Sequence, residues 1–318
     1  MDTMTYTTQS IWTWWIALYL FFGGLGAATL SVSFLTDMYC RPHRKLVLWG
    51  ALSGVVMLAI SSAVLFGHLL HHTAVIYVLN PLVLFYQPQA WIAWGTQFIL
   101  WMMVWGMLYA LPYMRETPLF MRMPLVGALL QMKWVAWLSD CCLKRRRIVG
   151  WLATINGIGT AVYTGLLIQS FPAVALWHNP GVPLLFTVSA FSTAFAYLLL
   201  LLNVFIPDEN DQDIRHRYER FDVILIATEL VILFSFFNYT LSGSESGYRS
   251  AQLLWHDMGW LVGFIGFGLL VPFLLELKGV IKGWSGRFPT VAAALLVLMG
   301  GYMLRHYFMY AGVYAYPW

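Results

Sequence analysis

Long apolar runs recur along the chain, separated by short polar segments. Each run is about 20 residues long, which suits an α-helix that crosses a bilayer, whereas strands of a membrane barrel would be about 10 residues long with alternating polarity. Helices also pair their backbone N–H and C=O groups internally, as lipid requires. The pattern therefore predicts an all-α, polytopic membrane protein with eight transmembrane helices, near residues 11–35, 46–70, 91–112, 148–170, 181–206, 221–240, 255–277 and 289–310.

One further apolar segment, residues 119–140, is expected to lie along the membrane interface as a helix rather than to cross the bilayer. It is interrupted by Pro124 and contains Arg122 and Lys133. A ninth span here would also move the basic run Lys144–Arg147, and every later basic loop, to the opposite side of the membrane. The distribution of charge therefore argues against a crossing.

The positions of Lys and Arg predict the orientation of the protein. Sixteen of the eighteen Lys and Arg residues fall in the first, third, fifth and seventh loops between spans, and the opposite loops contain only Arg249. Cytoplasmic loops accumulate basic residues, so both termini are expected to be extracytoplasmic. The start of the sequence lacks the charged region and cleavage site of a signal peptide, so the first span is expected to be retained.

Composition narrows the class of protein. The chain is 60% hydrophobic and only 10% charged, with a mean hydropathy of +0.70, so most of its surface is expected to contact membrane lipid. The net charge of +4 arises from the short loops and indicates topology, not nucleic-acid binding. The three cysteines form no C-x-x-C pair, which argues against an iron–sulfur cluster, a zinc ribbon or covalently bound haem in this protein.

Ionisable residues inside spans are costly and commonly functional. Glu229 lies about two turns into the sixth span and Arg305 deep in the eighth, so the two are expected to form either a structural ion pair or a proton relay. Asp37, Glu276 and Asp257 lie near span ends, where water is expected to reach them.

Aromatic, histidine and glycine residues converge toward the extracytoplasmic ends of the first, second and fourth spans. Such a cluster suits a quinone head group, which needs hydrogen-bond donors, a titratable partner, an aromatic wall and glycines that allow close approach. For any single member, ordinary placement at the interface is the alternative. The candidate quinone-binding residues are Trp15, Tyr19, Gly23, Gly24, His68, Tyr163 and Thr164, with His71 and His72 just beyond the second span.

Haem b needs facing histidines within the spans. Only His68, His256 and His306 lie in spans or at their edges, all toward the outer side. One outer haem is conceivable from these positions, two stacked haems are not supported, and no haem is expected.

The outer loops are poor in charge and rich in aromatic residues and proline, especially residues 71–90 and 171–180. Two interpretations stay open from the residues alone: an aromatic belt at the lipid interface, or a docking platform for another subunit.

Several segments, in order along the whole sequence, resemble the NrfD/polysulfide reductase membrane-subunit family. They are WWIALYLFFGGLGAATLS in the first span, NPLVLFYQPQAWIAWGTQ before the third, YTGLLIQSFPAVALWHNPGVPLLFTVSAFSTA between the fourth and fifth, TELVIL in the sixth, and LWHDMGWLVGFIGFGLLVPFLLEL followed by GGYMLRHYFMYAG. Trp15 stands where the family usually has proline.

The resemblance implies an eight-helix anchor without haem, built as two four-helix bundles: residues 1–170, with the quinone site, and residues 181–318. It implies a quinone pocket that includes the tyrosine of the YTG motif, Tyr163. The implied cofactor is menaquinone or ubiquinone, with iron–sulfur clusters only in a partner, and the implied location is the bacterial inner membrane. The implied partners are a four-cluster ferredoxin-like subunit docked on the extracytoplasmic loops and a catalytic molybdopterin subunit or a multihaem cytochrome c.

The protein is therefore expected to be a membrane anchor that exchanges electrons between quinol and an extracytoplasmic iron–sulfur subunit, without acting on the terminal substrate. One alternative is a proton-translocating or transporter-like module that uses Glu229 and Arg305. A passive anchor that only tethers catalytic subunits is the other.

Overall fold

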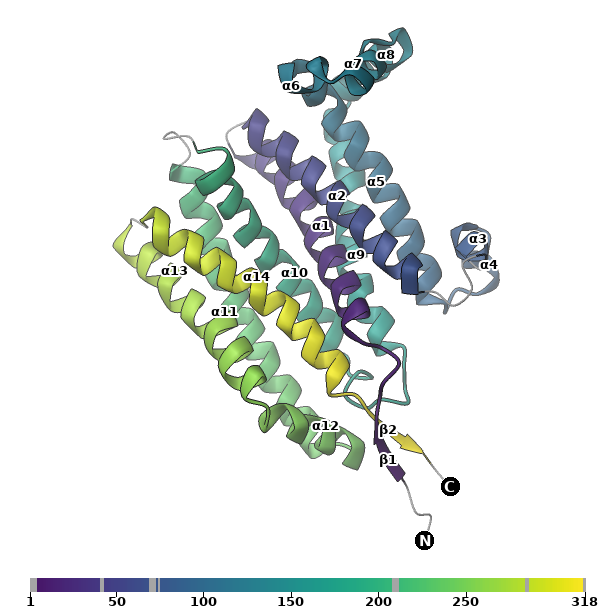
Figure 1. Cartoon of the computed structure of the whole chain (residues 1–318), viewed down its shortest axis with the longest axis vertical. Coiled ribbons are helices and arrows are strands. Elements are labelled where there is room, and N and C mark those ends of the chain that lie inside the picture. The colour runs from purple at the N-terminus through teal and green to yellow at the C-terminus, as the bar shows by residue number, and fades with distance from the viewer. Residues whose placement is uncertain are drawn as a thin grey trace.

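The structure, a computed structural model, describes residues 5–40, 43–68, 73, 75–207, 212–283 and 286–316. Within these residues, eight helices are long and apolar enough to cross a membrane, as the sequence predicts. They are α1 (Trp14–Tyr39), α2 (Arg44–His68), α5 (Trp91–Glu116), α9 (Arg146–Gln169), α10 (Gly181–Leu200) continued by the π-helical turn η2 (Leu201–Phe205), α11 (Gln212–Ser242), the π-helical η4 (Gly259–Leu270) continued by α13 (Val271–Lys282), and α14 (Arg287–Tyr310) (Figure 1).

The sixth span starts earlier than the apolar pattern indicates. Its helix α11 has 31 residues, or about 46 Å at 1.5 Å per residue, against a hydrocarbon core of roughly 30 Å. The first turns of α11 carry Arg215, Arg217 and Arg220, which the sequence places in a loop. The helix therefore extends beyond its apolar part at the basic end of the protein.

The spans pack as two sets. In the first set, α1, α2, α5 and α9 contact one another, and in the second set α10, α11, α13 with η4, and α14 do so. Helices α1 and α9 also pack on α10, and α1 on α14, so the two sets share a broad interface. The division into separate bundles of residues 1–170 and 181–318 stays a prediction.

Glycines allow the closest helix contacts. A Cβ atom on Gly26 of α1 would overlap the backbone of Gly54 of α2, and one on Gly300 of α14 would overlap the backbone of Gly268 of η4. Small residues that let backbones approach are common between membrane helices, where packing replaces the hydrophobic effect as the main attraction.

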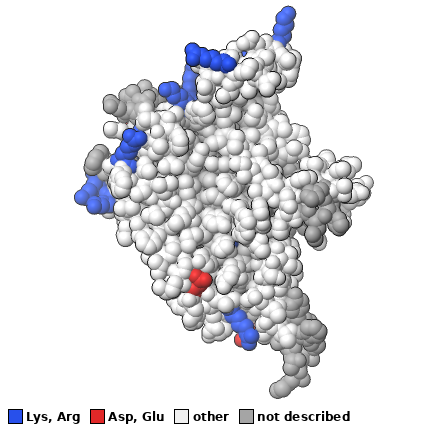
Figure 2. Space-filling view, in the orientation of Figure 1, with Lys and Arg blue, Asp and Glu red and all other residues white. Residues whose placement is uncertain are grey.

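The segment 119–140 is three short helices rather than one: α6 (Pro118–Arg122), α7 (Pro124–Gln131) and α8 (Lys133–Lys144). The expectation of a single helix is wrong, because Met123 and Met132 adopt extended backbone conformations and Pro124 begins a new helix. The three helices lie together at one end of the protein, where α6 and α8 pack on the end of α5 (Figure 1). Lys and Arg gather mainly toward this end, which we call the basic end (Figure 2).

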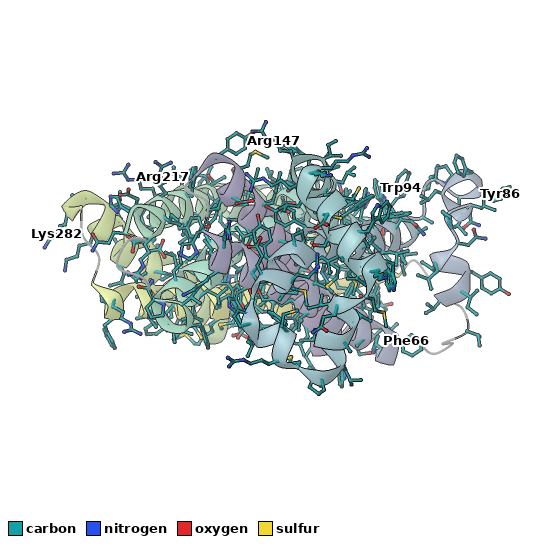
Figure 3. The ribbon with its side chains drawn as sticks, turned by 90° about the horizontal axis from the view of Figure 1, so that it is seen from above. Phe66, Tyr86, Trp94, Arg147, Arg217 and Lys282 are labelled. Carbon is teal, nitrogen blue, oxygen red and sulfur yellow. The ribbon has the colours of Figure 1, made fainter. Side chains whose placement is uncertain are left out.

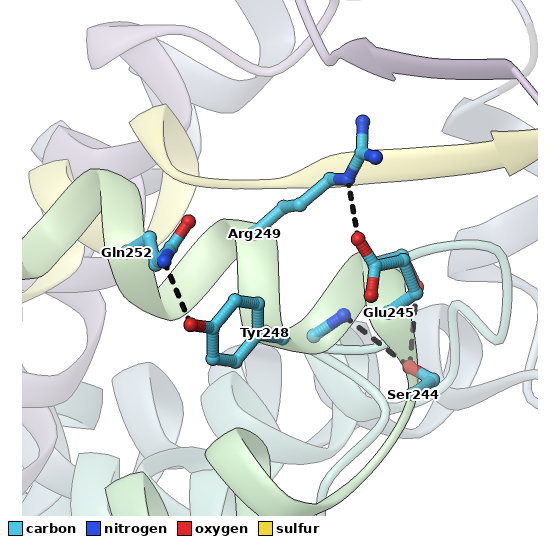
Figure 4. A network of polar contacts seen from close by, with 7 residues as sticks. Ser244, Glu245, Tyr248, Arg249 and Gln252 are labelled. Atoms are coloured by element: carbon cyan, nitrogen blue, oxygen red, sulfur yellow. Dashed lines mark hydrogen bonds and ion pairs between the residues drawn. The ribbon is translucent and has the colours of Figure 1, made fainter.

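Both termini lie at the opposite end, which we call the terminal end (Figure 1). Strand β1 (Thr5–Thr8) pairs antiparallel with β2 (Val313–Tyr316), and the Trp177 indole N–H donates to the Phe308 carbonyl at 2.7 Å. Helix α12 (Glu245–Trp255) also lies here, with Arg249 bonded to Glu245 (Figure 4). The Arg249 guanidinium also lies over the Tyr6 ring, 4.1 Å from its centroid. The extracytoplasmic location of both termini stays a prediction.

Candidate functional site

Two buried tyrosines, one from the first and one from the last helix of the first set of spans, meet in its interior. The Tyr19 and Tyr163 hydroxyls form a hydrogen bond of 3.0 Å, and both side chains are almost fully buried. The Ser61 hydroxyl donates to the Tyr19 carbonyl at 2.8 Å. A Cβ atom on Gly95 of α5 would overlap the Tyr163 ring, so the missing side chain makes room for the phenol. Helices α1, α2, α5 and α9 thus all help to fix this pair.

A cavity of about 460 Å³ lies beside the pair. This size falls within the range of about 300–1,000 Å³ that is usual for small-molecule sites. The walls are almost entirely apolar and come from α2, α5 and the short helix α3 (Val75–Leu79), with Tyr19 contributed by α1. The lining residues are Tyr19, Ser62, Ala63, Leu65, Phe66, Val75, Val78, Leu79, Ile92, Thr96, Ile99, Leu100 and Met103.

The cavity reaches the lipid-facing surface. Phe66, Ile92 and Leu100 line it and are also exposed on the outside of α2 and α5. The Gln97 side-chain amide donates to the Leu79 carbonyl at 2.9 Å, which ties α3 to α5 at the cavity wall. Seen from above, Phe66 lies on the same side of the protein as Tyr86, remote from Lys282 (Figure 3). A ligand with a polar head and an apolar tail suits this shape.

The other sequence-predicted quinone residues do not line the cavity. Gly23 faces α2 and Thr164 of α9, and Gly24 faces α10 and α14. The Thr164 hydroxyl donates to a carbonyl of its own helix at 2.7 Å. Trp15 is 43% exposed and stacks on the preceding tryptophan, and His68 is the half-buried last residue of α2. Tyr19 is therefore the member of the predicted cluster that lines the cavity, with Tyr163 bonded to it.

The histidines considered for haem contact different partners. His256 bonds to a carbonyl one turn earlier in the sequence, and the His306 ring stacks on Tyr302. His71 and His72 lie outside the described residues. Among the residues that the structure describes, no group of three or more His, Cys, Asp or Glu side chains is placed to hold a metal ion.

Glu229 and Arg305 lie in the second set of spans and are both buried. The Arg305 guanidinium donates to the Ser189 hydroxyl at 3.2 Å and to the Gly301 carbonyl at 2.6 Å. Ser189 also lies beside Glu229, so this hydroxyl is close to both the acid and the base. Their charges interact across it.

The expectation that water reaches Asp37 and Glu276 is wrong. Asp37 is 7% exposed and accepts hydrogen bonds from the Tyr109 and Tyr113 hydroxyls, the latter at 3.1 Å. Glu276 is 2% exposed and lies beside the carboxyl group of Asp222. Both acids are covered because the neighbouring helices continue as far as their own helix does. Asp257, in contrast, is partly exposed, and its carboxylate caps the start of η4.

Some residues of the interior were not identified from the sequence. They include Gly95, Ser61, Glu219 and Asp222. The two acids could have been identified from the sequence, because Glu219, Asp222 and Glu229 recur at a spacing that places them on one face of a helix. Gly95 and Ser61 could not have been identified in this way, because small residues are frequent in all membrane helices.

Comparison with known proteins agrees with this architecture. The family model described as "Polysulphide reductase, NrfD" matches residues 3–317. The protein is 21% identical to the protein NrfD homolog of Haemophilus influenzae over 315 residues, which cover 96% of each sequence. It is 26% identical to protein NrfD of Escherichia coli over 324 residues, which cover 95% of each. It is also 32% identical to the C subunit of polysulfide reductase from Wolinella succinogenes over 165 residues, which cover 50% of this protein and 51% of that subunit. With eight apolar helices and a match over nearly its whole length, the protein is a multi-pass protein of the bacterial inner membrane and belongs to the NrfD/polysulphide reductase family.

Proposed function

We propose that this protein is the quinone-handling membrane anchor of a respiratory oxidoreductase, in which it exchanges electrons between menaquinol or ubiquinol and an extracytoplasmic iron–sulfur subunit. The observation that supports this most directly is the apolar cavity of about 460 Å³ with the Tyr19 side chain in its wall and Tyr163 bonded behind it. Family membership supports the assignment of this protein as a membrane subunit, and the cavity supports a quinol as its substrate.

A quinone head group needs a hydrogen-bond donor at its carbonyl oxygen, and Tyr19 can supply one. When the Tyr163 hydroxyl donates to the Tyr19 oxygen, the Tyr19 proton is free to point into the cavity. Tyr19 is then the residue that touches the substrate, and Tyr163 is a positioning residue. The apolar walls of α2 and α5, open on the lipid side, suit the isoprenoid tail.

A partner that accepts the electrons would have to approach the terminal end. The short helices α3 and α4 (Val83–Tyr86) project beside the cavity, at the end of α5 away from α6–α8, and expose Ile76, Tyr77, Phe85 and Tyr86 (Figure 1). Tyr86 lies at the outer margin of the protein (Figure 3). Exposed apolar and aromatic side chains of this kind are typical of interface cores. They support docking of a ferredoxin-like iron–sulfur subunit, which would connect to a catalytic molybdopterin subunit or a multihaem cytochrome c.

The purified complex tests this proposal. Tyr19→Phe and Tyr163→Phe should abolish turnover driven by a quinol, while turnover driven by an artificial donor to the catalytic subunit stays intact. Tyr239→Phe is the matched control, because its side chain is 63% exposed on α11, far from the cavity walls. Unchanged quinol turnover in both test variants would refute the site. A complex without bound quinone, and insensitive to quinone analogues, would instead favour a passive anchor.

A further inference from the structure

Four buried carboxyl groups follow one another through the second set of spans. Glu219, Asp222 and Glu229 of α11 and Glu276 of α13 are each 3% exposed or less. The three on α11 lie on one face of the helix and extend over about 15 Å. We call these four residues the buried acid chain. Burying so many acids is costly, so their alignment calls for a function.

The middle of the buried acid chain is a carboxyl pair. Helix α13 packs on α11 so that the Glu276 carboxyl lies beside that of Asp222, and the Ser192 hydroxyl donates to Asp222. In the described part of the protein, no N–H or O–H group donates to either carboxylate oxygen of Glu276 or to Oδ2 of Asp222. Ionised carboxylates only accept hydrogen bonds, so a bond between these two requires a proton on one of them. The pair is therefore the place in the buried acid chain where two carboxyls can share a proton.

The buried acid chain opens toward water at the basic end. Glu219 accepts a hydrogen bond from the Thr290 hydroxyl at 2.8 Å, and its other oxygen lies 3.7 Å from Nδ1 of His216. All three residues line a polar cavity of about 210 Å³, large enough for several waters. The remaining lining residues are Asn203, Gln212, Arg215, Gly283 and Arg287. Glu219 is near enough to Glu276 for their charges to interact.

The other end of the buried acid chain is closed. Asp222 interacts electrostatically with Glu229, whose charge interacts in turn with that of Arg305. The Arg305 guanidinium packs against α1, where a Cβ atom on Gly24 would lie 3.4 Å from one of its nitrogens. The buried acid chain therefore runs from a water-accessible cavity to a fixed positive charge in the interior, and α1 blocks it there.

We propose that the buried acid chain is a proton half-channel that carries protons from the basic-end cavity to Glu229. A proton from cavity water binds the Glu219 carboxylate and passes to the Asp222–Glu276 pair, which releases its shared proton toward Glu229. Each transfer breaks one O–H bond and forms another, and no electron moves. Glu229 gains the proton and loses its negative charge beside Arg305. None of these residues belongs to the proposed quinone site, so this inference stands independently of it.

Infrared spectroscopy of the full-length protein in liposomes tests the half-channel without any quinone. The C=O stretching band of a protonated buried acid should be present and should shift when the medium is changed to D₂O. Asp222→Asn and Glu276→Gln should each remove the band, because the new amide donates in place of the shared proton. Glu219→Gln should keep the band and slow its shift by about tenfold or more, since the entry acid is gone.

Glu245→Gln is the matched control, because Glu245 pairs with Arg249 at the opposite end (Figure 4). It should leave both the band and its exchange rate unchanged. The absence of a protonated-acid band in the unmodified protein would overturn the proposal. An exchange rate that Glu219→Gln does not slow would overturn it too, since the pair would then be only structural. This second comparison holds even where Asp222→Asn or Glu276→Gln fails to fold.

Discussion

The Tyr19–Tyr163 hydrogen bond allows a quantitative test of the site's architecture. Tyr19→Phe removes one hydroxyl and leaves the Tyr163 hydroxyl, 3.0 Å away, without its partner in a side chain that is 2% exposed. A buried polar group without a partner costs about 1–3 kcal/mol. Tyr163→Phe strands the Tyr19 hydroxyl instead, but Tyr19 lines the cavity, where water can replace the lost bond. The first variant should therefore lose more stability than the second.

The double variant Tyr19→Phe/Tyr163→Phe should be no less stable than Tyr19→Phe alone. Replacing both partners by apolar groups of the same shape leaves no polar group stranded and can be nearly neutral. The expected coupling between the two positions is about 0.5–3 kcal/mol. Equilibrium unfolding of the detergent-solubilised protein, followed through its 16 tryptophans, measures all three variants against the unmodified protein. Costs that add to within about 0.5 kcal/mol would show that the hydroxyls act independently and would refute the bond.

Three further substitutions test the packing around the spans. Gly95→Ala should displace the Tyr163 ring and destabilise the fold by about 1–3 kcal/mol, with a matching loss of quinol-analogue binding by titration. Asp37→Asn should cost about 1.5–3 kcal/mol in an unfolding assay, because the Tyr109 hydroxyl then loses a charged acceptor. Trp177→Phe should cost about 1–3 kcal/mol and speed proteolysis of the terminal strands, since it breaks the indole bond that anchors the terminal end. A variant as stable as the unmodified protein would contradict the corresponding contact.

Sequence reasoning located the spans well, because hydrophobic length is a property of each segment alone. It was less able to predict their ends: α11 begins nine residues before the apolar window, where its first turns are polar yet helical. The window therefore excluded Glu219, and it separated Asp222 from any apparent partner. Only the packing of α13 against α11 shows that Glu276, far away in the sequence, completes the carboxyl pair.

The candidate site was only partly predictable for a related reason. Depth in the membrane can be counted from the sequence, and it placed Tyr19 and Tyr163 at a common level. The direction of each side chain depends on helix rotation, which the apolar surroundings do not reveal in a helix that is apolar on all sides. Trp15 consequently faces outward although its depth is suitable. The cavity walls have no sequence signature, because leucines that line a pocket look the same as leucines that face lipid.

Helix α1 brings the two proposed activities within reach of each other. Tyr19 belongs to the cavity wall, while Gly24, five residues later, lies against the Arg305 guanidinium. Five residues turn a helix by about 140° and advance it by about 7.5 Å, so the two sites lie on nearly opposite faces of one helix. Across about 10 Å of helix width and 7.5 Å of rise, or about 12.5 Å, one unit charge acts on another with roughly 1.3 kcal/mol at an effective dielectric constant of 20. A proton that arrives at Glu229 changes the net charge beside Arg305, and a tenfold change in an equilibrium at the cavity corresponds to a similar energy, about 1.4 kcal/mol. Electrostatic coupling through α1 is therefore large enough to link proton entry at the basic end to quinone chemistry toward the terminal end, without any contact between the two sites.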